Sequence, residues 1–276
     1  ELERRVRALT FGPYLNRLAA PLVRLADRAL VVAASTALDA SGEAAPGTVL
    51  ETGDGIRVRC GEGDLLLESL VTPGGRPVDP RGLPLEAGDV LPVYEEEAAR
   101  RLDALVGDLS RAEAFWRRRL AALDPASVPL AGALADDAAP AHHEVEVPEA
   151  WAREGSTVTT AAAVAAFLCR ILDVDETDLA LRSEAWSERT HEFRALVDDA
   201  PPVRIGVDPK SPFEWNLGQI REAIEQVQHR GGFLRDLIGR DPDLASNAEA
   251  LESDRCPVEI TLGRVEPSRR PLSFAV

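Results

Sequence analysis

The chain has 276 residues, of which 45% are hydrophobic, and this suits one large domain or two small domains with ordinary cores. The formal net charge of −16 works against binding to nucleic acid, because phosphate contacts draw on clustered Lys and Arg side chains. The best candidate for a membrane span, residues 18–38, is interrupted by a proline and three charged residues, so a membrane protein is not expected.

The cysteines and the first residues bear on the cellular compartment. Cys60, Cys169 and Cys256 are far apart, and their spacing fits neither a disulfide framework nor a zinc site. The opening residues lack the basic and then apolar layout of a signal peptide. Together these features favour the reducing environment of the cytoplasm.

Residues 48–70 consist of short stretches that alternate apolar and polar side chains. The stretches are separated by the turn sequences Gly53-Asp54-Gly55 and Gly61-Glu62-Gly63. Short strands joined by such turns are typical of a small antiparallel sheet or barrel. Neither turn leads into a Gly-Lys-Ser/Thr sequence, so a phosphate-binding loop is not indicated.

Helical spacing of apolar residues begins after this β region. Residues 95–123 place apolar side chains at the spacing of an amphipathic helix, and residues 159–172 are apolar nearly all round, which predicts a buried helix. Strands are expected at 143–147, 202–207, 257–265 and 271–276, and helices at 212–229 and 233–239. Alternation of strands and helices predicts an α/β layer.

The four histidines are candidates for acid–base catalysis, but each has a simpler explanation. His142 and His143 stand at the mouth of the predicted strand 143–147, which is expected to be a surface strand. His191 lies between acidic residues, where an exposed helical position is the commoner case. His229 precedes Gly231, and a cation is favourable at such a helix C-terminus.

Motifs for metal binding and nucleophilic catalysis are also missing from the sequence. The acidic run 173–178 lacks the glycine and the terminal glutamate of a calcium loop, so a solvated turn is expected. There is no His-Glu-x-x-His motif and no Gly-x-Ser-x-Gly elbow. The sequence therefore predicts no catalytic, cofactor-binding or metal-binding residue. Trp116 is expected in the core, and Trp215 fits either the core or a partner surface.

The first part of the chain resembles the C-terminal barrel of formyltransferases. The resemblance rests on residues 6–18, 45–63 and 73–77 and extends over about residues 1–92. It implies that formyl transfer belongs to a preceding Rossmann-like domain, which these residues do not include. In the family member that formylates initiator tRNA the barrel is basic, whereas residues 48–92 here are rich in acidic side chains.

The second part resembles the C-terminal lobe of nonribosomal peptide synthetase condensation domains. The resemblance rests on residues 113–123, 159–172, 202–221 and 232–244. The catalytic motif of that family has two histidines, three variable residues and then Asp-Gly. The adjacent histidines of this chain are followed by Glu-Val-Glu-Val-Pro, so they do not match the motif.

These resemblances imply a two-domain chain. Residues 1–92 would form a formyltransferase C-terminal-like β-barrel, and residues 93–276 an α/β half-condensation lobe of the chloramphenicol-acetyltransferase-like fold. The expected function is a non-catalytic structural module that links a formyltransferase-like domain to an adenylation domain. Its partners would be the adenylation and carrier domains of the same assembly line. The alternatives are a condensation-type acyltransferase acting on carrier-bound substrates, and a barrel that binds a carrier protein or RNA.

Overall fold

The computed structural model describes residues 1–11, 14–16, 20–26, 28–125, 157–252, 256–263 and 272–275. His142, His143 and the predicted strand 143–147 lie outside these residues. Within the described stretches, none of the helices combines the length and the hydrophobicity that a membrane span requires.

Contacts between residues divide the chain into two compact units. The first unit comprises Glu1–Arg117, Phe193–Val197 and Leu234–Ser253. The second unit comprises Arg118–Glu192, Asp198–Phe233 and Asp254–Val276. This grouping by contacts first changes after Arg117 and not at residue 92. The division into domains of residues 1–92 and 93–276 stays a prediction. The chain passes from one unit to the other five times.

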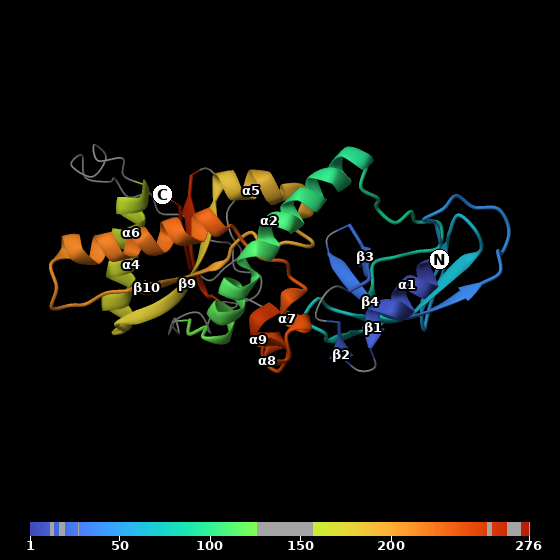
Figure 1. The fold of residues 1–276 in the computed structure, drawn as a ribbon, viewed down its shortest axis with the longest axis horizontal. Helices are drawn as coiled ribbons and strands as arrows, with labels where there is room; N and C mark the ends of the chain where they lie inside the picture. The colour runs from blue at the N-terminus through green and yellow to red at the C-terminus, as the bar shows by residue number, and fades with distance from the viewer. Residues whose placement is uncertain are drawn as a thin grey trace. The chain divides into compact units, whose positions relative to one another are not determined.

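An antiparallel sheet dominates the first unit (Figure 1). Its strands are β3 (Leu22–Arg24), β4 (Ala29–Leu38), β5 (Val49–Thr52), β6 (Ile56–Arg59), β7 (Asp64–Val71) and β8 (Pro77–Val78). They pair in the order β3-β4-β7-β6-β5, and β8 pairs with β7. The antiparallel β unit predicted from the alternating sequence is confirmed. Among the described residues the pairing ends at β3 and β5, so the expected closed barrel is an open half-barrel.

The sheet has its own hydrophobic core. Alternate side chains of β6 and β7 point inward, and Ile56, Leu67 and Leu70 are almost completely buried. The turn between these strands needs Gly63, because its φ of 71° lies in the left-handed region and a Cβ there would lie 2.7 Å from the Leu38 carbonyl oxygen. The helix α1 (Leu2–Leu9) packs against β4 and contributes buried Val6.

Helical segments complete the first unit. They are most of α2 (Glu96–Ala121), with α7 (Leu237–Arg240), α8 (Pro242–Ala245) and α9 (Ala248–Glu252). Shorter elements of this unit are β1 (Thr10–Phe11), β2 (Tyr14–Leu15) and the 3-10 turn η1 (Pro80–Gly82). The 3-10 turn η3 (His191–Phe193) spans the division between the two units. The predicted helix over residues 95–123 is confirmed, whereas the helix predicted over 233–239 begins only at Leu237.

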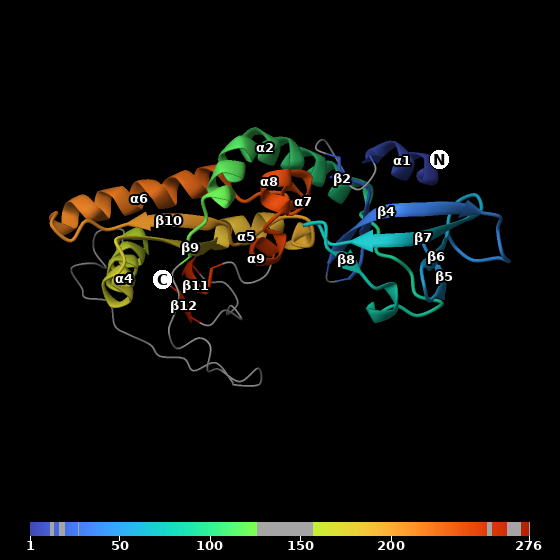
Figure 2. The same ribbon diagram turned by 90° about the horizontal axis from the view of Figure 1, so that it is seen from below.

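The second unit is an α/β layer, as the alternating elements predict. Its strands are β9 (Glu176–Ser183), β10 (Pro202–Gly206), β11 (Val258–Leu262) and β12 (Leu272–Ala275). They follow the order β10-β9-β11-β12, in which β11 is parallel to both neighbours and β10 is antiparallel to β9. The helices are α4 (Thr157–Leu172), α5 (Glu184–Thr190) and α6 (Phe213–Arg230). The helix α6 packs along β10 (Figure 2), and α4 packs against α6 and β11.

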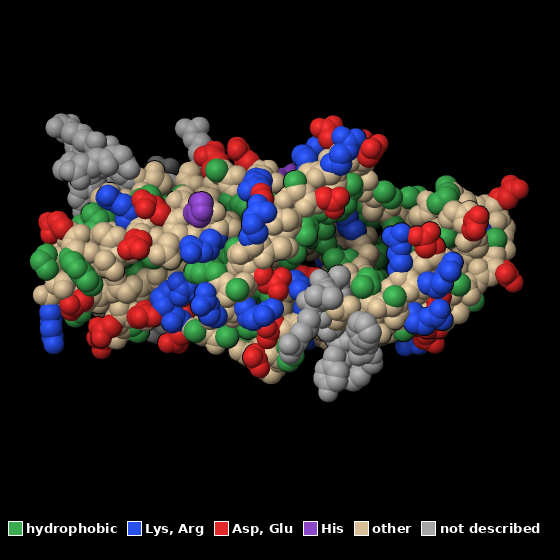
Figure 3. Space-filling view, in the orientation of Figure 1, with side chains coloured by type: hydrophobic (Ala, Val, Ile, Leu, Met, Phe, Trp, Pro, Cys, Tyr) green, Lys and Arg blue, Asp and Glu red, His purple; other side chains and the backbone are tan. Residues whose placement is uncertain are grey.

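Two expectations about the second unit are wrong. The acidic run 173–178 is not only a solvated turn, because β9 begins at Glu176 and Asp178 is buried. The helix α4 packs against α6 and β11 but is not buried all round. Phe167 and Ile171 on α4 are 57% and 63% exposed. The start of α6 is also apolar and exposed, with Trp215 at 52%, and hydrophobic side chains gather there in Figure 3.

Trp116 is completely buried, which confirms its expected place in the core. Its indole packs edge-to-face on Phe115, with 4.9 Å between ring centroids. We expect Trp116→Ala to lower the free energy of unfolding by about 3–5 kcal/mol, because it removes a large apolar side chain and leaves a cavity. Trp215→Ala is the matched control, with an expected change of about 0.5 kcal/mol because Trp215 is half exposed. Urea denaturation measures both, and equal effects would contradict this assignment of core and surface.

Candidate functional site

The described histidines stand where the sequence predicts them. His191 follows α5 and is exposed, and His229 is exposed in the last turn of α6. The chain leaves α6 through Gly231, whose φ is 67°. Within the described residues, neither His191 nor His229 forms a hydrogen bond or an ion pair with a nucleophilic side chain, so the geometry assigns them no catalytic role.

The cysteine thiols are poorly suited to nucleophilic attack. Burial, together with the negative charge of Asp175, raises the pKa of Cys169 to about 11. Burial also raises the pKa of Cys60, again with help from a carboxylate, that of Asp64. A raised pKa leaves the thiol protonated at neutral pH, and the thiolate is the reactive form.

Buried charges are the chemically distinctive groups of this structure, and the sequence analysis missed them. Within the described residues no group of three His, Cys, Asp or Glu side chains could hold a metal ion. The buried charged residues are Arg59, Asp64, Asp178, Asp198, Arg240, Asp241 and Glu259. A sequence signal existed for Glu259, which stands between the apolar residues Val258 and Ile260 of a predicted strand.

Asp64 is the centre of the first ion cluster, at the start of β7. Its carboxylate lies 2.7 Å from Arg57 Nη2 and 3.0 Å from Arg59 Nη1. The Ser41 hydroxyl and amide also donate to it, at 2.8 and 3.1 Å. Burial by itself raises the pKa of Asp64, but the hydrogen bonds from Ser41 and Arg57 and the charge of Arg59 outweigh it and lower the pKa. The cluster fastens the loop at residue 41 to the sheet.

The second cluster joins α2 to α7 and α8 within the first unit. Arg240, of which only 5% of the side chain is exposed, lies 3.2 Å from Glu113 Oε2 and 3.1 Å from Asp236 Oδ2. Arg117 of α2 lies 2.6 Å from Asp241 Oδ2. Burial raises the pKa of Asp236 despite the nearby charge of Arg240. Two arginines and three carboxylates thus hold these helices together.

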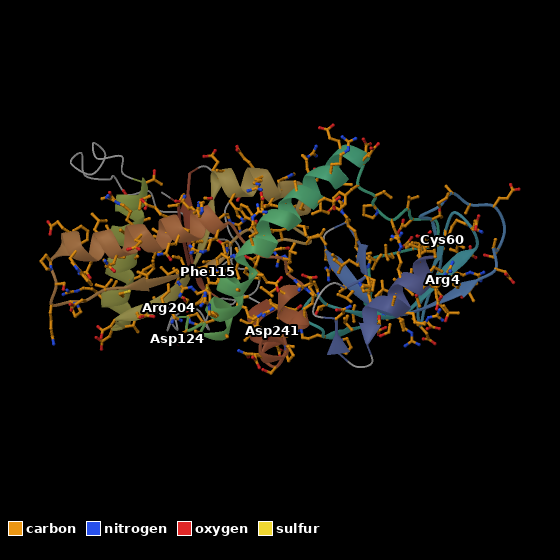
Figure 4. The ribbon with its side chains drawn as sticks, in the orientation of Figure 1. Arg4, Cys60, Phe115, Asp124, Arg204 and Asp241 are labelled. Atoms are coloured by element: carbon orange, nitrogen blue, oxygen red, sulfur yellow. The ribbon has the colours of Figure 1, made fainter. Side chains whose placement is uncertain are left out.

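The third cluster surrounds Asp178 in the second unit. Its side chain is fully buried, and its Oδ2 lies 2.6 Å from Arg204 Nη2. Arg119 Nη1 is 3.7 Å from Oδ1, and the Asp124 amide donates to Oδ2 at 2.7 Å. Figure 4 places Arg204 and Asp124 next to each other beside the end of α2. The hydrogen bond from Arg204 raises the pKa of that guanidinium, whereas burial lowers the pKa of Arg119.

A fourth cluster lies on the strands of the same sheet. Arg182 of β9 pairs with buried Glu259 of β11 at 3.1 Å and with Asp199 at 2.6 Å. Burial acts to lower the pKa of Arg182, but the charges of Asp199 and Glu259 outweigh it and raise the pKa. Glu259 also accepts a hydrogen bond from Thr261 at 3.2 Å. The pair between Arg182 and Glu259 links the neighbouring strands β9 and β11.

A hollow of about 690 Å³ lies on the first unit between residues 40–46 and 59–63. Its charged lining consists of Glu43, Glu62 and Arg59. The Arg59 guanidinium is already committed, because its Nη2 donates to the carbonyl oxygens of Ser41 and Gly42 at 2.8 and 2.9 Å. Cys60, labelled in Figure 4, also lines the hollow, but its raised pKa makes it a weak nucleophile. The hollow therefore does not combine groups that would catalyse a reaction.

The lowered pKa of Asp64 predicts a pH-dependent contribution to stability. A carboxylate whose pKa is lower in the folded chain stabilises the fold above its ordinary value of 3.8, and this stabilisation is lost as the pH falls through the folded value. Asp64→Asn should therefore lower the free energy of unfolding most near pH 7, and the difference from wild type should shrink below about pH 4. Denaturation from pH 2 to 7 measures this, with exposed Glu62→Gln as the control. A deficit that stays constant with pH would contradict the ion cluster.

Comparison with known proteins identifies the first stretch of the chain. Residues 1–83 match the family described as formyl transferase, C-terminal domain. Methionyl-tRNA formyltransferase of Burkholderia thailandensis is 43% identical over 60 residues, which are 20% of this chain and 18% of that protein. The chain thus corresponds to less than a fifth of the length of this curated relative.

A solved structure of a variant of the starter condensation domain of the rhizomide synthetase RzmA is 14% identical, with a TM-score of 0.31. It covers 64% of this chain and 41% of the other chain. This TM-score is too low for a fold to be assigned from the likeness. The half-barrel sheet from β3 to β8 lies within residues 1–83, which match the formyl transferase C-terminal domain.

Proposed function

We propose that the chain is a non-catalytic structural module of a nonribosomal peptide synthetase. In this proposal a formyltransferase C-terminal-like β unit is fused to a half-condensation lobe and connects a formyltransferase-like domain to an adenylation domain. The adenylation and carrier domains of the same assembly line are the proposed partners. The cytoplasm is the proposed compartment.

The use of the buried charges carries this proposal. Asp64, Asp178, Glu259 and Arg240 each pair with oppositely charged side chains of this chain. Catalytic groups are usually perturbed, accessible and placed around a cleft where a substrate can reach them. Here these buried charged groups are neutralised by partners within the chain, and their ion pairs hold segments together.

The connection to a peptide synthetase is supported by the sequence of the second part. Residues 159–172 and 202–221 resemble the central helix and the strand-to-helix segment of a condensation lobe. Both stretches have the expected secondary structure, as α4 and as β10 followed by α6. The matched domain in residues 1–83 supports a formyltransferase-like neighbour, because in that family the named domain is the C-terminal one.

The two rival functions have less support. A condensation-type acyltransferase would need the two-histidine motif followed by Asp-Gly, which the sequence does not contain. Binding of RNA would need a basic surface, but the net charge is −16, and on the face drawn in Figure 3 Lys and Arg lie among Asp and Glu side chains.

The proposal predicts that the chain transfers no formyl group and forms no amide bond. The chain is incubated with a formyl-folate donor and an amine acceptor, or with two loaded carrier proteins, and product is followed by mass spectrometry. Only the rate of the reaction without protein is expected. Turnover that is lost in His143→Ala and kept in the matched variant His229→Ala would contradict the proposal.

A further inference from the structure

The turn between β7 and β8 receives a carboxylate from a distant part of the chain. Glu252, the last residue of α9, accepts a hydrogen bond from the Thr72 hydroxyl at 3.0 Å and from the Gly74 amide at 2.5 Å. Arg76 Nε donates to it at 2.7 Å and adds a positive charge. Only 13% of the Glu252 side chain is exposed. One carboxylate is therefore held by a hydroxyl, an amide and a guanidinium, all from five consecutive residues.

Hydrogen bonds within the turn itself, apart from those to Glu252, hold residues 72–76 in shape. The Thr72 amide donates a hydrogen bond to the Arg76 carbonyl oxygen, and the Arg76 amide donates one to the Thr72 hydroxyl at 3.1 Å. The Gly75 amide donates to the Thr72 carbonyl at 2.8 Å. Gly74 is required for close approach, since a Cβ there would lie 2.5 Å from Glu252 Oε1. The turn's own hydrogen bonds thus aim its donors at a single point.

A second set of contacts holds segment 234–252 near its first residue, Leu234. The Arg24 guanidinium lies 4.0 Å from the Tyr94 ring centroid, and the Tyr94 ring packs edge-to-face on Phe193 at 5.3 Å. Residues 193–197 are then joined to the segment 234–252 by a bridge between Val197 and Leu234. The helix α7 also packs against β2 (Figure 1). Segment 234–252 is therefore fastened near both of its ends.

We propose that residues 72–76 form a carboxylate-binding site whose ligand is Glu252, and that this site fastens segment 234–252 to the formyltransferase-like sheet. The ligand class is a carboxylate side chain at the end of a helix, supplied by the same chain. Segment 234–252 consequently folds with the sheet, although 158 or more residues separate it from the turn in sequence. This inference does not depend on whether the chain is catalytic.

Hydrogen–deuterium exchange of the full chain tests the site. Glu252→Gln keeps the side-chain shape and removes the charge that the turn binds. The exchange rates of residues 242–252 and 72–76 should rise roughly ten- to hundredfold, because local opening no longer has to break charge-assisted hydrogen bonds. Residues 213–230 of α6, which lie in the other unit, should exchange as in wild type.

A glycine pair supplies the matched control. Gly74→Ala places a methyl group against Glu252 and should raise the same exchange rates, whereas a Cβ at Gly82 meets nothing within 4 Å and Gly82→Ala should change nothing. If Glu252→Gln does not fold, Thr72→Val removes one hydrogen bond and should give a smaller rise in the same residues. Wild-type exchange in residues 242–252 of the folded Gly74→Ala and Thr72→Val variants would overturn the proposal, as would an equal rise in Gly82→Ala.

Discussion

A charged side chain that leaves water must find an opposite charge and hydrogen-bond partners, and this constraint shapes the whole chain. Desolvation of a lone carboxylate or guanidinium costs several kcal/mol even after the protein relaxes. Asp64 meets the cost with two arginines and Ser41, and Asp178 meets it with Arg204, Arg119 and a backbone amide. These contacts fix the loop at Ser41 to the sheet and the residues after α2 to β9.

The same constraint explains why the fold holds together without a closed barrel. The contacts of Glu252 and of Phe193 bring later segments onto the sheet unit, and the Arg240 cluster fastens those segments to α2. The net stabilisation that such ion networks give is modest, because the gain in attraction between the charges is offset by lost hydration.

The sequence was sufficient to predict elements whose signal is local. The hairpins of β5, β6 and β7 follow from the glycine turns, and α2 and α6 follow from helical spacing of apolar residues. The strand β9 was missed because Glu176 and Asp178 belong to an acidic run that is typical of a solvated turn. Asp178 is neutralised in the folded chain by Arg204. The local sequence around either residue does not indicate that the two side chains pair.

The grouping of segments into units was also beyond the sequence, for the same reason. The stretch 232–244 was expected to belong to a condensation-like lobe, but residues 234–253 group with the antiparallel sheet of the first unit. The deciding groups are Glu252 and the turn at residues 72–76, whose hydrogen bonds depend on three-dimensional proximity. The exposed apolar residues of α4 were not predicted. An apolar sequence favours burial, but it does not show whether another element covers the side chain.

The central claim is that the buried charges serve to hold the chain together, and a double-mutant cycle on Asp178 and Arg204 tests it most directly. The free energies of unfolding of wild type, Asp178→Asn, Arg204→Gln and the double variant give the coupling between the two side chains. We predict a favourable coupling of about 1–3 kcal/mol, as is usual for contacting residues in one ion network. A coupling near zero, with each single variant as stable as wild type, would contradict the account.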